Sequence, residues 1–282
     1  MQQVTLRNDW LTVIISTMGA EMQSIKDVSG VERLWQGDSR FWAGRAPILF
    51  PIAGGLKEDG YYLEGERYSL PKHGYVRKLV WNLESVGSTS AVFLTKQKEP
   101  GFPFDYELRA CYTLDRDTIR VSYRVQSRER RAFYFGIGAH EGFATPGGIE
   151  DYSIVFDEEE TLENYVLHGN LIAREPVVMA SGIREFPLKY EDFSIDALVF
   201  PNLKSRGLVL KSRKDGDRIR VDYPGHDVLM LWTRPGAEYI CIEPWTNAPD
   251  FLDGDMQIEH KPGCIRLEPG QEAERSHRIT IL

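Results

Sequence analysis

Two histidines, one arginine and one glutamate interrupt the apolar and glycine-rich segments of this 282-residue chain. Arg45 precedes an apolar run that is punctuated by prolines. His73 is followed by a glycine, which predicts a tight backbone bend that presents the imidazole. Glu243 ends an apolar run that begins at Tyr239, and the proline after it stops strand pairing. A carboxylate there must be hydrogen-bonded or functional, because burying it unpaired is costly.

The segment 134–143 carries the second histidine, His140. If this segment is extended, alternate side chains point to opposite faces. Phe135 and the apolar residues two and four positions later would face the core, whereas Gly136, Gly138 and His140 would share the other face. Glycine weakens a strand unless something must approach its backbone, so these two glycines suggest that a ligand comes close.

These residue types suit general acid–base chemistry on a small neutral polyol. A glutamate is ionised near neutral pH, and a histidine can donate or accept a proton. Glu141 follows His140 directly and would point to the opposite face, so the two are not an obvious metal or acid–base pair. The sequence has no cluster with metal-ligand spacing, no hydrolase nucleophile motif and no nucleotide-binding fingerprint, which makes nucleotide chemistry unexpected.

The elements that must position these residues are predicted to be β-strands. Short alternating runs separated by turn residues recur along the chain, and no stretch of ten or more residues has helical apolar spacing. Short helical turns are expected near 40–42 and 190–193, and the acidic run 157–160 is predicted to be a solvated turn. Four pairs of runs predict hairpins: 12–17 with 22–25, 61–63 with 67–70, 108–114 with 118–125, and 208–210 with 219–223.

So many antiparallel hairpins predict an all-β protein with two large stacked sheets, or a sandwich curled on itself. No Ser/Gly-rich or Pro-rich linker divides the sequence, so residues 1–282 are expected to form one domain.

Composition and charge restrict the partners and the compartment. A net charge of −8 argues against nucleic acid as a partner. The N-terminus lacks a basic region followed by a long apolar run, which argues against a signal peptide and a membrane span. The three cysteines, Cys111, Cys241 and Cys264, form no zinc motif, and their odd number is poor evidence for a disulfide framework. We therefore expect a cytoplasmic protein that binds neither nucleic acid nor membrane.

Five motifs occur in a specific order along nearly the whole chain. They are Gly44-Arg45 with Pro51, Pro71-Lys72-His73-Gly74-Tyr75, Gly138-Ala139-His140-Glu141-Gly142-Phe143, Asp196-Ala197-Leu198-Val199-Phe200, and Cys241-Ile242-Glu243-Pro244-Trp245. This order resembles the aldose 1-epimerase (galactose mutarotase) family, in particular its bacterial LacX-like subgroup.

The resemblance implies a large antiparallel β-supersandwich that holds a hexose in an open cleft. It implies that Glu243 is the general base for the anomeric hydroxyl and that His140 is the general acid for the ring oxygen. His73 would hydrogen-bond near the ring oxygen, and Arg45 and Asp196 would hold sugar hydroxyls. No metal and no other cofactor is implied, and we expect a monomer or homodimer.

Three other functions are compatible with parts of the sequence. A hexose 6-phosphate would need cationic groups at the far end of the cleft, for which Lys57, Lys72 and Arg77 are available. A carbohydrate-binding or sensing protein could keep the fold without the chemistry, since fold does not imply function. A glycoside hydrolase is less favoured, because Glu243 has no clear carboxylate partner in a matching motif.

Overall fold

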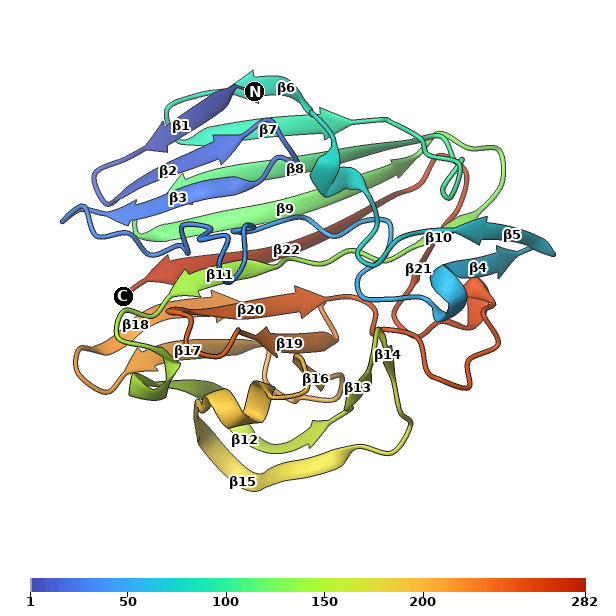
Figure 1. Ribbon diagram of the computed structural model, residues 1–282. Coiled ribbons are helices and arrows are strands. Elements are labelled where there is room, and N and C mark those ends of the chain that lie inside the picture. The colour runs from blue at the N-terminus through green and yellow to red at the C-terminus, as the bar shows by residue number, and fades with distance from the viewer. Residues whose placement is uncertain (1) are drawn as a thin grey trace.

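The computed structural model describes residues 2–282, and Figure 1 shows that its regular elements are mainly β-strands. The strands of its sheets pair antiparallel, so the all-β prediction is confirmed. Within the described residues, none of the helices has the length and apolar character needed to cross a membrane. The helical segments are short 3-10 turns: η1 (Lys57–Asp59), η2 (Val76–Lys78), η3 (Ile149–Asp151), η4 (Tyr190–Phe193) and η5 (Ile258–His260).

A nine-stranded sheet forms one layer of the molecule (Figure 1). Its strands come from both halves of the sequence, and the C-terminal strand lies in its middle. In spatial order they are β15 (Val177–Pro187), β12 (Tyr152–Asn164), β17 (Gly207–Ser212), β18 (Gly216–Asp222), β22 (Glu272–Ile281), β9 (Thr118–Ser127), β8 (Tyr106–Asp115), β7 (Ser90–Thr95) and β6 (Asn82–Val86).

Five smaller sheets complete the described part of the fold. The four-stranded sheet has the order β11 (Glu141–Ala144), β20 (Tyr239–Trp245), β19 (Val228–Trp232) and β16 (Leu198–Phe200). The three-stranded sheet has the order β1 (Gln3–Arg7), β2 (Leu11–Ser16) and β3 (Met22–Asp27). The two-stranded sheets are β10 (Phe133–Phe135) with β21 (Ile265–Leu267), β4 (Gly60–Leu63) with β5 (Glu66–Ser69), and β13 (Leu167–His168) with β14 (Leu171–Ile172).

One large hydrophobic cluster joins the layers. It contains Leu6 of the three-stranded sheet, Ile240 and Ile242 of the four-stranded sheet, and Val121 and Leu210 of the nine-stranded sheet. The molecule is therefore a sandwich in which the nine-stranded sheet packs against the three- and four-stranded sheets.

All four predicted hairpins are confirmed, as β2–β3, β4–β5, β8–β9 and β17–β18. The turn predicted near 190–193 is η4. Near 40–42 the chain makes one hydrogen-bonded turn, in which the amides of Phe41 and Trp42 donate to the Asp38 carbonyl at 3.0 and 2.9 Å.

The prediction of a solvated turn at 157–160 was right about the exposure of residues 157–159 and wrong about the turn and about Glu160. These residues lie inside β12, where the pairing with β15 is irregular between Val155 and Glu160. Glu160 is buried, and its carboxylate accepts hydrogen bonds from the amides of Lys204 and Ser205 at 3.2 and 2.6 Å. Those donors lie more than forty residues away, so local charge did not reveal them.

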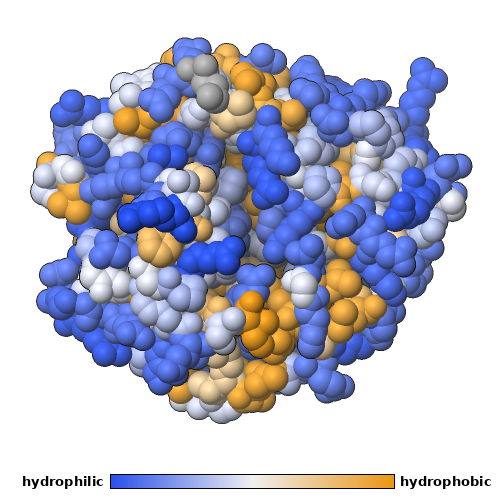
Figure 2. Space-filling model, viewed as in Figure 1, coloured by the Kyte–Doolittle hydropathy of each residue, from blue (hydrophilic) through white to orange (hydrophobic). Residues whose placement is uncertain are grey.

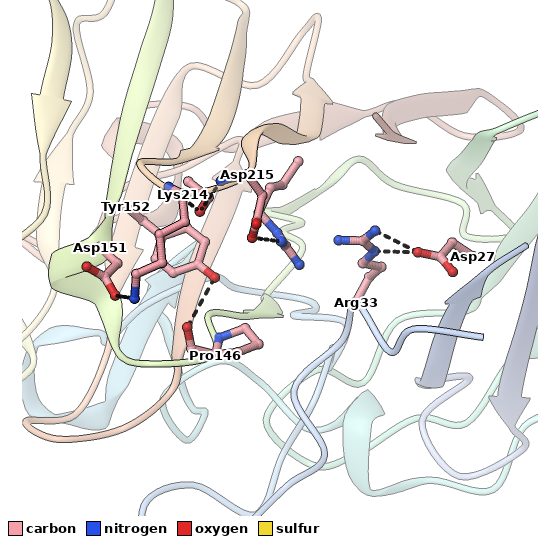
Figure 3. A network of polar contacts seen from close by, with 9 residues as sticks. Asp27, Arg33, Pro146, Asp151, Tyr152, Lys214 and Asp215 are labelled. Atoms are coloured by element: carbon pink, nitrogen blue, oxygen red, sulfur yellow. Dashed lines mark hydrogen bonds and ion pairs between the residues drawn. The ribbon is translucent and has the colours of Figure 1, made fainter. Parts of the chain in front are cut away.

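Charged side chains cover much of the surface. Figure 2 shows a largely hydrophilic face on which apolar residues form small groups. Ion pairs tie together segments that are distant in sequence, as in Figure 3, where Lys214 of the β17–β18 turn contacts Asp151 at 2.5 Å, just before β12. In the same view, Tyr152 donates its hydroxyl to the Pro146 carbonyl at 3.4 Å.

Candidate active site

One cleft of about 240 Å³ collects most of the predicted site residues. Its wall combines titratable, cationic and aromatic side chains. They are His73, His140, Asp196 and Glu243, the cations Lys72, Arg77 and Arg234, and the indoles of Trp42, Trp232 and Trp245.

A second cavity of about 220 Å³ lies between Tyr61 and the segment 249–262, and none of the predicted site residues lines it. The charged side chains along it are already matched. The pairs are Asp250 with Lys261, Asp253 with Arg174, and Asp255 with His260. The first cleft is therefore the better candidate for chemistry.

Strand β20 is buried on both faces, and one of these faces carries Glu243 to the cleft. Ile240 and Ile242 enter the main core, whereas Cys241, Glu243 and Trp245 alternate on the opposite face. The carboxylate of Glu243 is only 2% exposed, and its Oε2 atom makes no hydrogen bond within the described residues. A buried, unbonded carboxylate oxygen at a cleft is poised to bind or react.

His140 lies beside Glu243, at the start of the strand that neighbours β20 in the four-stranded sheet. Its neighbour Glu141 pairs with Ile242, so His140 immediately precedes the paired part of β11. Its Nε2 atom is 3.4 Å from Glu243 Oε2. The indole of Trp42 stacks on the imidazole, with 4.8 Å between ring centroids and 22° between planes, and this contact fixes the ring.

His73 lies on the bend that the sequence predicted. His73 and Gly74 both have positive φ angles, 67° and 65°. The amide of Gly54 donates to His73 Nδ1 at 3.1 Å, so Nε2 carries the proton of the neutral imidazole. The ring also lies edge-on to Trp245, 5.3 Å away, and is thereby held in place.

Burial favours the neutral forms of the titratable groups in the cleft. It lowers the pKa of His140 to about 3, and the positive charges of Arg77 and Lys72 act in the same direction. Burial also lowers the pKa of His73 well below its usual value. The pKa of Glu243 is raised well above its usual value by burial, against which the charge of Lys72 acts.

Asp196 also lies in the cleft wall, two residues before the start of β16. Its carboxylate is 4.0 Å from the Lys72 ammonium. Arg77 lies on η2 and donates to the Lys72 carbonyl at 3.0 Å, so its guanidinium is held near this pair. The cleft therefore has a second carboxylate, which the sequence did not reveal as a partner of Glu243.

The structure does not bring Arg45 into the cleft wall. Its guanidinium donates to the Gln36 carbonyl at 2.8 Å, and its amide donates to Glu21. Lys57 is also directed elsewhere, since its ammonium donates to the Gly254 carbonyl at 3.0 Å. The cations in the wall are Lys72, Arg77 and Arg234 instead.

The aromatic wall was missed by sequence reasoning. Trp42 lies only three residues before Arg45, and Trp232 lies on β19 opposite Cys241. Tryptophans that flank the five motifs were the available signal, because amphipathic rings are common where an apolar wall meets a polar ligand.

The glycines beside His140 make room for protein side chains, and the expectation that they admit a ligand was wrong. A Cβ atom on Gly136 would lie 1.7 Å from Asn247 Oδ1, and one on Gly138 would lie 2.5 Å from a carbon of the Trp245 indole. The other half of the prediction is confirmed, since Phe135 and the alternating apolar residues after it are in the main core.

Glu141 points away from the cleft, as predicted. It is buried between the layers, and its Oε1 atom is 2.9 Å from Nε2 of the buried His277 on β22. This contact connects the strand beside His140 to the nine-stranded sheet.

A thiol lies close to the catalytic candidates. Donor atoms of His140, Cys241 and Glu243 all lie within 4.8 Å of one another. Sequence spacing gave no sign of this group, because His140 is about a hundred residues from the other two.

Comparison with known proteins assigns the chain to a family. The family model for aldose 1-epimerase matches residues 2–280. The plasmid and chromosomal LacX proteins of Lactococcus lactis subsp. lactis are both 35% identical to this chain over 99% of each sequence.

Solved structures agree with this assignment. A galactose mutarotase related enzyme from Lactobacillus acidophilus is 28% identical, with a TM-score of 0.91, and the match covers 100% of this chain and 97% of the other. A galactose mutarotase-like protein from Lactobacillus casei has a TM-score of 0.94 over 100% of both chains; at 23% identity it supports the fold alone. The predicted galactose mutarotase-like fold is confirmed, and the chain belongs to the aldose 1-epimerase family.

Proposed function

We propose that this protein interconverts the α and β anomers of a free aldose by acid–base opening of the sugar ring. The observation that carries the proposal is the pair formed by Glu243 and His140, whose Oε2 and Nε2 atoms face each other across 3.4 Å in the cleft. Family membership supports a sugar epimerase, and the roles of individual residues are our proposal.

The proposed reaction needs one base and one acid. Glu243 takes the proton of the anomeric hydroxyl while His140 gives a proton to the ring oxygen, and the bond between the anomeric carbon and that oxygen breaks. Rotation about the bond to the next carbon presents the other face of the aldehyde. The same two proton transfers, reversed, close the ring as the other anomer.

One transferable proton on the pair is enough for this cycle. Burial favours a protonated Glu243 and a neutral His140 in the free cleft, since it raises the pKa of the first and lowers that of the second. The reactive arrangement has the same number of protons, with the proton moved from the carboxyl to the imidazole. The Lys72 ammonium acts to lower the pKa of both groups, so it favours the ionised carboxylate and disfavours the protonated imidazole.

The remaining cleft residues are proposed to hold the sugar. His73 is suited to donate a hydrogen bond from Nε2 to the ring oxygen, because its Nδ1 is already occupied by the Gly54 amide. Asp196 and Arg77 are suited to bind hydroxyl groups. A substrate contact by Arg45 stays a prediction, and Arg77 is the arginine that the cleft geometry supports.

Polarimetry tests the proposal. Freshly dissolved α-glucose and α-galactose should reach their equilibrium rotation faster with the protein than in buffer alone. The proposal fails if the folded protein accelerates mutarotation of no aldose. Tight sugar binding without acceleration would indicate a carbohydrate-binding or sensing protein, and release of sugar from an aryl glycoside would indicate a hydrolase that uses Glu243 with Asp196.

A second candidate substrate is a hexose 6-phosphate. Three cations, Lys72, Arg77 and Arg234, line the same cleft, and within the described part of its wall Asp196 and Glu243 are the only acidic residues. A phosphate group would be recognised by charge-assisted hydrogen bonds from such cations. The rates for α-glucose and α-glucose 6-phosphate, measured at equal concentration, separate the two candidates.

Arg77→Gln sharpens this comparison. If the phosphate is the natural group, the substitution should lower the specificity constant for the phosphorylated sugar about tenfold more than for the free sugar, since it removes a hydrogen bond to a charged group. Equal losses for both sugars would argue for a free aldose.

The free thiols of all three cysteines fit our proposal that the reaction takes place in the cytoplasm.

A further inference from the structure

Cys241 has no part in the proposed epimerisation, yet its thiol lies beside both catalytic candidates. It is fully buried and lies on the face of β20 that carries Glu243. Unlike His140 and Glu243, it does not line the cleft, so it lies deeper in the protein. It belongs to a small cluster with Tyr239 that is covered by Trp42 and Trp232.

The three donor atoms have the spacing of a metal site. In a tetrahedral zinc site, donors about 2.0–2.3 Å from the metal lie roughly 3.5 Å from each other. His140 Nε2 and Glu243 Oε2 are 3.4 Å apart, and no pair within the group of His140, Cys241 and Glu243 exceeds 4.8 Å. Small side-chain movements would bring all three donors onto one ion.

The chemical nature of the donors is selective. Imidazole, thiolate and carboxylate together suit Zn²⁺ and similar ions, whereas Mg²⁺ and Ca²⁺ prefer oxygen donors alone. A thiolate and a carboxylate carry two negative charges, so a divalent ion would leave the buried group neutral. Glu243 Oε2, which has no hydrogen bond within the described residues, is available as a ligand.

We infer that His140, Cys241 and Glu243 form a binding site for a thiophilic divalent cation such as Zn²⁺. The ion would occupy the floor of the cleft, with its fourth position open toward the cleft. As the metal binds, the thiol proton of Cys241 and the proton that the free cleft holds on Glu243 both leave to the buffer. Since the ion uses both members of the proposed acid–base pair, metal and sugar exclude each other, and Zn²⁺ is a competitive inhibitor.

Cobalt absorption tests the binding directly and does not depend on any activity. The Cys111→Ala/Cys264→Ala variant retains Cys241 as its only thiol. Titration of this protein with Co²⁺ should give a thiolate-to-cobalt charge-transfer band with a stoichiometry of one ion per chain, together with the visible bands of a tetrahedral ion. Absence of the sulfur band from the folded protein would overturn the inference.

Zinc inhibition tests the same site through the reaction, and this part rests on the proposed function. Zn²⁺ should slow mutarotation, EDTA should restore it, and excess sugar should relieve the inhibition. Inhibition of Cys241→Ala is measured relative to the rate of the same variant in EDTA. The zinc concentration for half inhibition should be at least about a hundredfold higher than for the wild type, because loss of a group that only supports a ligand already lowers metal affinity 10–100-fold. Cys111→Ala is the matched control and should keep the wild-type sensitivity.

An unchanged zinc sensitivity in Cys241→Ala would also overturn the inference. If Cys241→Ala does not fold, the cobalt spectrum of the protein that retains Cys241 still decides. A protein that shows the sulfur–cobalt band but no mutarotation would contradict the proposed function and leave the metal site intact.

Discussion

The side chains of Glu243 and His140 have their chemistry set by what surrounds them. Both are nearly excluded from water, and each faces the other at 3.4 Å. Burial alone would neutralise both, whereas the nearby ammonium of Lys72 favours the ionised carboxylate. The same ammonium also lowers the pKa of His140, so in the empty cleft the shared proton stays on Glu243 and has to pass to His140 for the proposed reaction.

Replacing either member of this pair should abolish most of the rate. We expect Glu243→Gln and His140→Asn each to lower the mutarotation rate by about two orders of magnitude or more, as for loss of a general acid or base. Polarimetry measures the rate, and circular dichroism verifies the fold. Glu259→Gln and His260→Asn, both at exposed positions, are the matched controls. Near-wild-type rates for both site variants would show that other residues do the chemistry.

Single residues were predictable where the signal was local. The bend at His73 followed from the glycine after it. The expectation that Pro244 stops strand pairing after Glu243 was wrong, since β20 continues to Trp245 and both residues after Glu243 are paired with β19. The direction of a long side chain was not predictable. Arg45 turns to the Gln36 carbonyl, and Arg77 turns to the cleft, because partners distant in sequence decide where a flexible guanidinium goes.

At the scale of elements, the bend that carries His73 depends on close backbone contact. Gly74 has a φ angle of 65°, and a Cβ atom there would lie 2.0 Å from the Phe50 carbonyl oxygen. The same bend is joined to the neighbouring segment by the bond from the Gly54 amide to His73. A change at this glycine should therefore move the imidazole as well as destabilise the fold.

Gly74→Ala should lower the free energy of unfolding by more than left-handed backbone strain alone would, which is about 1–2 kcal/mol. The reason is that the added methyl group also clashes with the backbone. Gly65→Ala isolates the strain, since Gly65 has a φ angle of 82° and a Cβ atom added there would meet nothing within 4 Å beyond its chain neighbours. Urea unfolding of both variants gives the two free energies of unfolding, and polarimetry gives the activities. Equal destabilisation of the two variants would disprove the crowding argument.

Elements formed by neighbouring residues were predicted well, and those completed by distant residues were not. Each of the four hairpins has its turn and both strands within one short stretch. The acidic run in β12 was misread because the amides that bind Glu160 belong to residues 204 and 205. A carboxylate with such donors can be buried inside a strand.

At the scale of the whole molecule, buried histidines connect the two layers. His277 of β22 bonds to Glu141 of β11, and the ring of His226 lies 6.2 Å from that of His277. His226 is fully buried, and burial lowers its pKa to about 3, with the charges of His277 and Arg275 acting in the same direction.

This buried imidazole makes stability depend on pH. The unfolded chain takes up a proton at His226 near pH 6.5, whereas the folded chain does so only near pH 3. Between these values the unfolded state binds more protons, so stability is lost as the pH falls, by about 1.4 kcal/mol per pH unit at the steepest.

Urea unfolding between pH 7 and pH 4 checks this prediction. His226→Phe removes the pH-dependent contribution of His226 to the free energy of unfolding. As the pH falls, the wild type should therefore lose more stability than the variant. His168→Phe, at an exposed position, is the matched control. Parallel pH profiles for wild type and His226→Phe would contradict the assignment.

The sequence was enough to predict the fold class, stacked antiparallel sheets, but not the order of the strands within those sheets. Alternating runs and turns were enough to indicate stacked antiparallel sheets. The insertion of the C-terminal strand β22 between β18 and β9 depends in part on contacts between segments more than a hundred residues apart. No local pattern encodes such pairing, because many strands have interchangeable hydrophobic faces.

The indole stacked on His140 gives the cleft an optical signal of its own. Three of the six tryptophans in the chain, Trp42, Trp232 and Trp245, line this one cleft. Their emission reports on the polarity and contacts of the cleft interior, so a sugar or a metal ion that enters should change the intrinsic fluorescence of the protein. Occupancy can thereby be titrated without label and without turnover, even in variants whose chemistry has been removed.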